Sequence, residues 1–241
     1  MLTPTARQSI TRCALLHNLS ETECQAVIEQ GRLTQVKADD YFFHQGDDAT
    51  IMYILIEGQA KLSQINEEGQ QVIINYFGPG NGLGIIVALS YMPYPLSAVA
   101  VVDCQAICWH RDVMRALMLR YPTLAMNGME MVGKRFAWLQ DRYQEVATKQ
   151  VEQRLARAVL RLVRQFGKRI ETGVLIDIPL SRQDLAEMTG TNLYNVSRIL
   201  SKWEQEGLVQ NGRKQVTLCK AHELVMIAED LHRKFPEQAD K

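Results

Sequence analysis

The sequence predicts an α+β protein in which an N-terminal antiparallel β-roll of the cupin type is followed by a long helix and a C-terminal winged helix-turn-helix. Three observations lead to this fold class. Residues 33–110 hold short β-branched runs between glycines, residues 125–146 repeat apolar side chains every three or four positions, and residues 181–209 have helix-turn-helix spacing. The expected parts are a roll domain with a leading helix (1–110), a helical segment (111–150) and a helix-turn-helix domain (151–241).

The composition is that of a soluble globular protein. Of the 241 residues 46% are hydrophobic and 22% are charged, which is enough for one large core or two smaller ones. No apolar run of about 18 residues is present, and the N-terminus lacks the apolar stretch of a signal peptide, so we expect a cytoplasmic location. The five cysteines suggest no even disulfide framework, which fits a reducing compartment.

The charge is distributed unevenly. The formal net charge is zero, yet residues 149–220 contain 13 Lys and Arg against 7 Asp and Glu, a balance of +6. Such a segment is able to bind phosphates and release their counterions. Solvated helical faces also collect charge, so this observation alone leaves both interpretations open.

The N-terminal half contains a helical lead-in and a series of short strands. Residues 10–30 are expected to be helical, with Ser20 and Glu23 forming a capping box. Short strands separated by glycine turns then predict an antiparallel barrel or sandwich. The apolar stretch 83–98 fits either a buried strand with its turn or the wall of a pocket. The strand-like runs are IMYILIEG, AKLSQI, QQVIINYF and SAVAVVDCQAICW.

A narrow apolar seam follows in the predicted long helix. Its residues are Ala125, Met129, Val132, Phe136, Leu139, Tyr143 and Val146. Spacings of four and three residues over three heptads favour pairing with a second helix, because a helix that only faces a core has a broader stripe. We expect the part from Met129 to Val146 to form a parallel dimer seam, and packing within one chain is the alternative. A second amphipathic helix over 151–167, ending at Gly167, and a short strand over 173–180 come next.

The segment SRQDLAEMTGTNLYNVSRIL (181–200) carries the most specific pattern. Ser181 and Asp184 predict a capped helix start. Counted from Arg182, Ala186 is fifth and Gly190 is ninth, which supplies the small residue and the turn that a helix-turn-helix needs. The three expected core positions are Leu185, Val196 and Ile199. A two-stranded wing with its turn at Asn211-Gly212 should follow.

The second helix of this pair would expose side chains suited to DNA. These are Asn192, Asn195, Ser197, Arg198 and Lys202, together with Tyr194. A helix of this kind enters the major groove, where its N-terminal residues meet base edges and flanking groups meet phosphates. A helical hairpin used for protein contacts is the alternative.

The order of these parts resembles the CRP/FNR superfamily of bacterial transcription regulators, which have a cyclic-nucleotide-binding-like roll. The resemblance runs from about Leu15 to Leu218 and is strongest at LIEGQAKL (55–62) and at residues 181–200. It implies an effector-sensing roll, a dimerisation helix and a DNA-binding domain. It also implies a homodimer on a pseudo-palindromic promoter site, with RNA polymerase as a partner near residues 165–173, which we expect to be a loop.

The resemblance carries over to individual DNA-contacting positions. Arg182 and Gln183 match the start of the first helix, which contacts the backbone, and Arg198 with Ser197 before it matches the base-proximal arginine. Thr191 belongs to the same expected contact set. The usual glutamate is replaced by Tyr194, so the common half-site sequence is not expected.

The effector pocket departs further from the cyclic-nucleotide members of the family. Their Gly-Glu and Arg-Ser pairs read Gly84-Ile85 and Leu96-Ser97 here, and their Thr-Ser pair on the long helix reads Leu139-Gln140. A buried phosphate without the arginine would lack a compensating charge, so we expect an effector other than cyclic AMP. The expected pocket consists of Tyr76, Leu83, Gly84, Ile85, Tyr91, Leu96, Ser97, Phe136, Leu139 and Tyr143, with Tyr94 nearby.

Several alternatives stay open at this point. No cofactor or metal is assigned; a small organic effector fits best, and haem is the alternative. Possible axial ligands are His17, His44, Cys104, Cys108 and His110, and the family's close N-terminal cluster of cysteines for an iron-sulfur centre is missing. A pocket without a ligand, or a regulatory subunit acting on a protein partner, are further alternatives. The absence of P-loop, GxSxG and HExxH motifs argues against an enzyme.

Overall fold

The computed structural model describes residues 3–231, and the chain divides into two compact units, residues 1–139 and 140–241. The boundary falls inside one long helix. The expected bounds 1–110 and 151–241 include residues 1–2 and 232–241, which lie outside the described residues. Across residues 3–231, none of the helices combines the length and the apolar character needed to cross a membrane.

The first unit begins with helices α1 (Pro4–Thr11), η1 (Ala14–Leu16) and α2 (Glu21–Glu29). The predicted capping box is present, because the backbone N–H of Ser20 donates to Glu23 Oε2 at 2.8 Å and Ser20 Oγ accepts from the N–H of Glu23 at 3.3 Å. Helix formation starts earlier than expected, at Pro4. The reason is that Thr3 caps α1, its hydroxyl accepting from the N–H of Ala6 at 3.1 Å.

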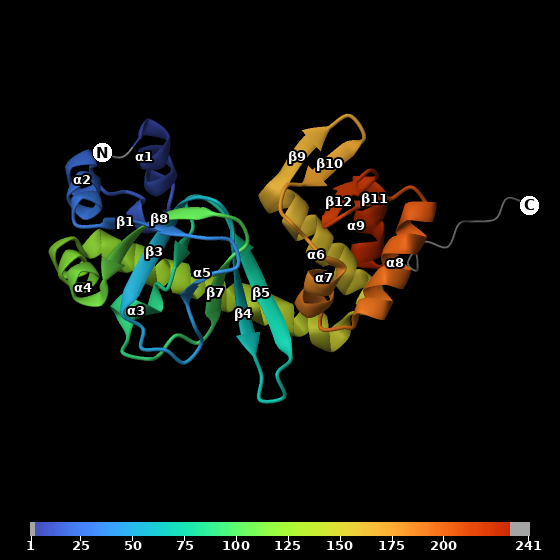
Figure 1. The fold of residues 1–241 in the computed structure, drawn as a ribbon, viewed down its shortest axis with the longest axis horizontal. Helices are drawn as coiled ribbons and strands as arrows, with labels where there is room; N and C mark the ends of the chain where they lie inside the picture. Colours follow the sequence, from blue (N-terminus) through green and yellow to red (C-terminus); the bar gives the residue numbers. More distant parts are fainter. Residues whose placement is uncertain (1–2, 232–241) are drawn as a thin grey trace, which may run out of the picture. The chain divides into compact units, whose positions relative to one another are not determined.

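The predicted antiparallel β-roll follows and consists of two four-stranded sheets, ordered β1-β8-β3-β6 and β2-β7-β4-β5. Figure 1 shows β4 and β5 extending as a long hairpin away from the end that α1, α2 and α4 cover. The strands are β1 (Arg32–Val36), β2 (Tyr41–Phe43), β3 (Ile51–Glu57), β4 (Ala60–Ile65), β5 (Gln71–Phe77), β6 (Gly82–Leu83), β7 (Ser97–Ala100) and β8 (Cys104–His110).

Strand β3 explains how the roll is packed. Its odd-numbered residues Tyr53 and Leu55 face the other sheet, whereas Met52 and Ile54 face a second core formed with the helices. Both faces of the strand are therefore buried, which is why its sequence is an unbroken apolar run. In the helical core, Trp109 Nε1 donates to the carbonyl of Val27 at 2.8 Å and so joins β8 to α2.

The stretch 83–98 does not continue as a strand. After β6 it forms the short helix α3 (Ile86–Leu89) and then continues without regular structure to the start of β7. Gly84 permits this because its φ is +70° and an added Cβ would lie 3.1 Å from the carbonyl of Ile51. Tyr94 fixes the end of the stretch, since its hydroxyl donates to the Ile51 carbonyl at 2.6 Å.

The helical segment 111–150 is formed by two helices, α4 (Arg111–Arg120) and α5 (Pro122–Thr148), with a turn at Tyr121. On α5 the early seam residues Ala125 and Val132 pack against the helical core. The other seam residues, Met129, Phe136, Leu139, Tyr143 and Val146, are all exposed in the single chain.

The second unit is a winged helix-turn-helix, as predicted. Its elements are α6 (Val151–Phe166), β9 (Gly167–Ile170), β10 (Gly173–Ile176), α7 (Arg182–Thr189), α8 (Leu193–Gln205), β11 (Val209–Gly212), β12 (Gln215–Leu218) and α9 (Ala221–Glu229). The strands form one sheet in the order β11-β12-β10-β9.

Two sequence-based details of this unit were wrong. Residues 165–173 are not a loop, because β9 pairs with β10 in a hairpin. The wing turns at Arg213-Lys214 and not at Asn211-Gly212, two residues earlier, because Gly212 is already paired with Gln215. The side chain of Glu204 accepts from the N–H of Asn211 at 2.9 Å, and this bond keeps Asn211 in the strand.

Candidate functional site

The helix-turn-helix has the geometry that its spacing predicts. Ser181 N–H donates to Asp184 Oδ2 at 2.8 Å, which starts α7. Gly190 ends α7 in the left-handed conformation with φ +60°. Leu185, Val196 and Ile199 are buried between the two helices and so fix their crossing.

Most of the expected DNA-contacting side chains lie on the surface of α7 and α8. Arg182, Gln183, Asn192, Tyr194, Arg198 and Lys202 are exposed, and Thr191, Asn195 and Ser197 are half-buried. Asn192 has a structural duty as well, because its Oδ1 accepts from the N–H of Asn195 at 2.9 Å and caps α8. Tyr194, which is 73% exposed, stands one turn before Arg198.

The exposed residues differ in how strongly they are held. Lys202 Nζ pairs with Glu152 of α6 at 3.1 Å, and the same carboxylate accepts from Trp203 Nε1 at 3.0 Å. Arg198 makes no ion pair with any residue in the described part of the chain. Of the two cations, Arg198 is therefore the one available to a base edge without first leaving a carboxylate.

Two arginines outside the motif hold the turn of the helix-turn-helix. Arg154 Nε on α6 donates to the carbonyl of Thr189 at 2.9 Å, and its Nη2 donates to that of Gly190 at 3.3 Å. Arg142 on α5 donates to the carbonyl of Met188. These bonds satisfy the free carbonyls at the end of α7. Sequence reasoning missed both residues, because nothing in the motif spacing points to cations on preceding helices.

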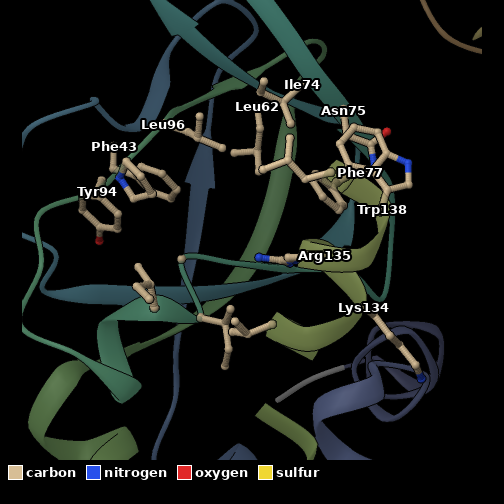
Figure 2. A pocket seen from close by; sticks show the side chains of 16 residues that line it. Phe43, Leu62, Ile74, Asn75, Phe77, Tyr94, Leu96, Lys134, Arg135 and Trp138 are labelled. Atoms are coloured by element: carbon tan, nitrogen blue, oxygen red, sulfur yellow. The ribbon is translucent and has the colours of Figure 1, made fainter. Parts of the chain in front are cut away.

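A cavity of about 360 Å³ lies in the first unit between the roll and α5. Figure 2 shows the side chains that enclose it, with Phe43, Tyr94, Leu62 and Ile74 contributed by the roll and Trp138 by the helix. Its sixteen lining residues are Phe43, Leu62, Ile74, Asn75, Phe77, Gly84, Ile85, Ile86, Tyr94, Pro95, Leu96, Val132, Lys134, Arg135, Trp138 and Leu139.

Four of the ten expected pocket residues line this cavity, namely Gly84, Ile85, Leu96 and Leu139, and so does Tyr94. Tyr76 and Leu83 are buried inside the roll instead. The Ser97 hydroxyl accepts from the N–H of Gln45 at 2.9 Å.

The remaining three expected pocket residues are exposed. Tyr91 lies beneath the guanidinium groups of Arg111 and Arg115, at 5.1 and 4.8 Å from its ring centre. Phe136 and Tyr143 project from α5, and Tyr143 belongs to the second unit. These aromatic side chains were expected in the pocket from their residue type alone. None of them lines the cavity, because each one points elsewhere.

Arg135 is the cation among the lining residues that sequence reasoning missed. Figure 2 shows its side chain extending from α5 into the space that the other lining residues enclose. It donates a hydrogen bond to the carbonyl of Gly82, and its guanidinium carbon lies 5.3 Å from the centre of the Phe77 ring. Burial lowers the pKa of Arg135. No Asp or Glu is among the lining residues in the part of the chain that the structure describes.

The possible haem ligands do not gather at this cavity. None of His17, His44, Cys104, Cys108 and His110 is among its lining residues. Burial raises the pKa of Cys104 to about 11, which disfavours the thiolate that binds iron. Within residues 3–231 no group of three or more His, Cys, Asp and Glu is arranged to hold a metal ion.

An antiparallel roll joined through a long helix to a winged helix-turn-helix is an architecture of DNA-binding transcription regulators. Residues 33–121 match the family model of the cyclic nucleotide-binding domain, and residues 153–227 match that of the Crp-like helix-turn-helix domain. The chain belongs to the CRP/FNR family of transcription regulators.

Relatives with known roles agree with this family. The chain is 28% identical over 214 residues to the cyclic AMP receptor protein of Thermus thermophilus, covering 89% of this chain and 96% of the relative. It is 25% identical over 189 residues to the global nitrogen regulator of Synechococcus elongatus, covering 78% and 85%. The structure of FixK2 from Bradyrhizobium japonicum has the same fold, with a TM-score of 0.73, 20% identity and coverage of 82% and 96%.

Proposed function

We propose that this protein is a homodimeric transcription regulator whose binding to a promoter is controlled by a small effector other than cyclic AMP, bound in the cavity between the roll and α5. The observation that carries the proposal is the exposed face of α8, where Tyr194 and Arg198 stand one turn apart. The opposite face of this helix is buried, and Asn192 caps its N-terminus. Such a face is suited to the edges of bases in the major groove.

The dimer is supported by the seam on α5. Phe136 is 61% exposed and Tyr143 is 78% exposed in the single chain, on a helix of 27 residues. Apolar side chains at heptad spacing bury this area when two such helices pair. A two-fold symmetric dimer reads two half-sites about 34 Å apart, so the promoter site is pseudo-palindromic.

An effector other than cyclic AMP is supported by the chemistry of the roll side. Ile85 and Leu96 stand where the cyclic-nucleotide members of the family carry a glutamate and an arginine, and both are apolar walls of the cavity. Arg135 on α5 supplies the cavity with a cation, so the case against cyclic AMP rests on the missing glutamate and not on a missing positive charge. The ribose hydroxyls of a nucleotide would find no carboxylate acceptor among the described lining residues. The haem alternative has less support, because its possible axial ligands lie elsewhere.

RNA polymerase is the proposed protein partner. The β9 strand, which follows α6 directly, is exposed along its whole length and carries Lys168 and Arg169. A cationic strand at an accessible edge is suited to an acidic protein surface.

The experiment that tests the proposal is a comparison of Arg198→Ala with Arg164→Ala. Arg164 is an exposed arginine near the end of α6 and lies outside the predicted DNA contact set. Fluorescence anisotropy with a DNA site selected by the wild-type protein should show binding weakened about 10- to 100-fold by Arg198→Ala. Arg164→Ala should leave the specific affinity nearly unchanged. Equal affinities for the two variants would instead favour a regulatory subunit that acts on a protein partner.

A further inference from the structure

We infer that the cavity between the roll and α5 takes an organic carboxylate with an apolar, ring-containing body, and that Arg135 receives its negative charge. The inference rests on the proposed function only in taking this cavity as the effector site.

Arg135 is a half-buried cation without an acidic partner. Among the described residues it bonds the carbonyl of Gly82 and lies over the face of Phe77, and it forms no ion pair with an Asp or Glu. The buried thiol of Cys13 also lies close enough to interact with its charge, but burial raises the pKa of that thiol to about 11 and so keeps it neutral. Its neighbour Lys134 differs in both respects, because its side chain is 69% exposed and pairs with Glu130. An arginine keeps its proton when buried, so a charge at this depth is unfavourable until an anion approaches it.

The other residues that line the cavity indicate that the uncharged part of the ligand is apolar. The lining residues include two cations, Arg135 and the exposed Lys134, and one amide side chain, that of Asn75. Most of the other lining groups are aliphatic or aromatic. The hydroxyl of Tyr94 is already used, since it donates to the Ile51 carbonyl and accepts from the Ile51 N–H at 3.0 Å. A ligand with many hydroxyls would lose its water hydrogen bonds here without replacing them.

The size and geometry of the site favour a ring-containing acid. Phe43 stacks on Tyr94 with ring centres 3.9 Å apart, which forms a flat wall, and Phe77 lies beside the guanidinium. A volume of about 360 Å³ is within the range of small-molecule sites and has room for one or two rings. The guanidinium has five N–H donors, of which the bond to Gly82 uses one, and its fork matches two oxygens of a carboxylate or of a phosphate. The mostly apolar lining, with no carboxylate to accept from sugar hydroxyls among the described residues, favours a simple organic acid over a nucleotide.

The competing explanation is that Arg135 only joins α5 to β6 through the Gly82 carbonyl. The two explanations predict opposite effects of Arg135→Met, which keeps an apolar side chain of similar length. If Arg135 is a structural clamp, the variant has a lower melting temperature. If it awaits an anion, removal of the unpaired charge leaves the melting temperature of the ligand-free protein unchanged or raises it.

The binding test uses the full-length protein and isothermal titration calorimetry. The probes are 3-phenylpropionate and 2-naphthoate, their uncharged primary amides, and cyclic AMP. We expect at least one carboxylate to bind at least 10-fold more tightly than its amide, and cyclic AMP to bind more weakly than that carboxylate. Arg135→Met should abolish the preference for the carboxylate, Arg135→Lys should retain part of it, and Lys134→Met should retain all of it.

Three results would overturn the inference. They are equal affinity for carboxylate and amide, no measurable binding of either carboxylate, and a lower melting temperature of Arg135→Met with its carboxylate preference intact. The Arg198→Ala variant separates this inference from the proposed function. It should bind the carboxylates as the wild-type protein does, so a failure of DNA recognition and a failure of ligand recognition are seen independently.

Discussion

The carboxylate of Glu145 lies 2.7 Å from Nη1 of Arg161, within the second unit. The same buried carboxylate pairs with Arg142 on its own helix and lies 3.6 Å from Arg157. Burial lowers the pKa of Arg161 to about 10, and the nearby Arg142 adds to this effect. One carboxylate thus interacts with three guanidinium groups and joins the end of α5 to α6. One of the three, Arg142, also supports the turn of the helix-turn-helix.

Glu145→Gln should therefore destabilise the second unit. The substitution removes the carboxylate that pairs with Arg142 and Arg161, while Arg157 keeps its pair with Glu229 at 2.7 Å. Loss of one partner in a buried pair costs about 3–5 kcal/mol. Urea denaturation followed by circular dichroism measures the loss. Glu130→Gln is the matched control, because its carboxylate forms an exposed pair with Lys134 on the same helix and is worth less than about 1 kcal/mol. Equal losses from both variants would contradict this role of Glu145.

Tyr194→Glu should change the preferred DNA half-site. Tyr194 stands at the position where most family members have a glutamate, whose carboxylate accepts from cytosine N4. We expect selection from a random DNA pool to give different sites for the wild-type protein and the variant, with a gain for cytosine worth about 1–3 kcal/mol. Tyr194→Phe serves as the control for the ring itself. If the glutamate variant selects the wild-type site unchanged, Tyr194 does not face a base.

Phe136→Glu should convert the proposed dimer to a monomer. A carboxylate in the centre of the seam would have to be desolvated between two helices, which opposes pairing. Size-exclusion chromatography with light scattering reports the mass directly. Leu119→Glu is the control, since Leu119 is 85% exposed on α4 and lies outside the seam. A dimeric Phe136→Glu protein would place the interface elsewhere.

The cysteines should differ in reactivity with a thiol reagent at pH 8. Cys219 is exposed and should react first. Burial raises the pKa of Cys13 and of Cys104 to about 11 each, so only about one thousandth of either is thiolate at this pH. Both should react only after unfolding in guanidinium. Mass spectrometry of the labelled peptides distinguishes the sites, and Cys219→Ser should remove the fast phase. Rapid labelling of Cys13 in the native protein would contradict its burial.

Patterns that involve neighbouring residues were readable from the sequence. The capping boxes at Ser20 and Ser181 depend on contacts three residues apart, and the helix-turn-helix depends on fixed offsets within one segment, so both were predicted correctly. The apolar run of β3 indicated a strand for the same reason. Its two buried faces became clear only when the helices were seen on the side opposite the second sheet.

The cavity was harder to predict because it joins residues from distant segments. Arg135 meets Gly82 and Phe77 more than 50 positions away in the sequence, and no local pattern distinguishes it from the exposed Lys134 beside it. The stretch 83–98 also deviated from its apolar pattern. A left-handed glycine at position 84 and the anchoring of Tyr94 turn it into a short helix and a loop.

Arg135 and Phe136 are consecutive residues of α5, and one faces the cavity while the other faces outward from the helix. Successive residues of an α-helix point about 100° apart, so a movement of the helix that adjusts one side chain also displaces the other. If a ligand at Arg135 strengthens self-association through Phe136, self-association strengthens ligand binding by the same free energy, because thermodynamic linkage is reciprocal. Ligand affinity then depends on protein concentration, and a titration of one dilute and one concentrated sample measures that coupling directly.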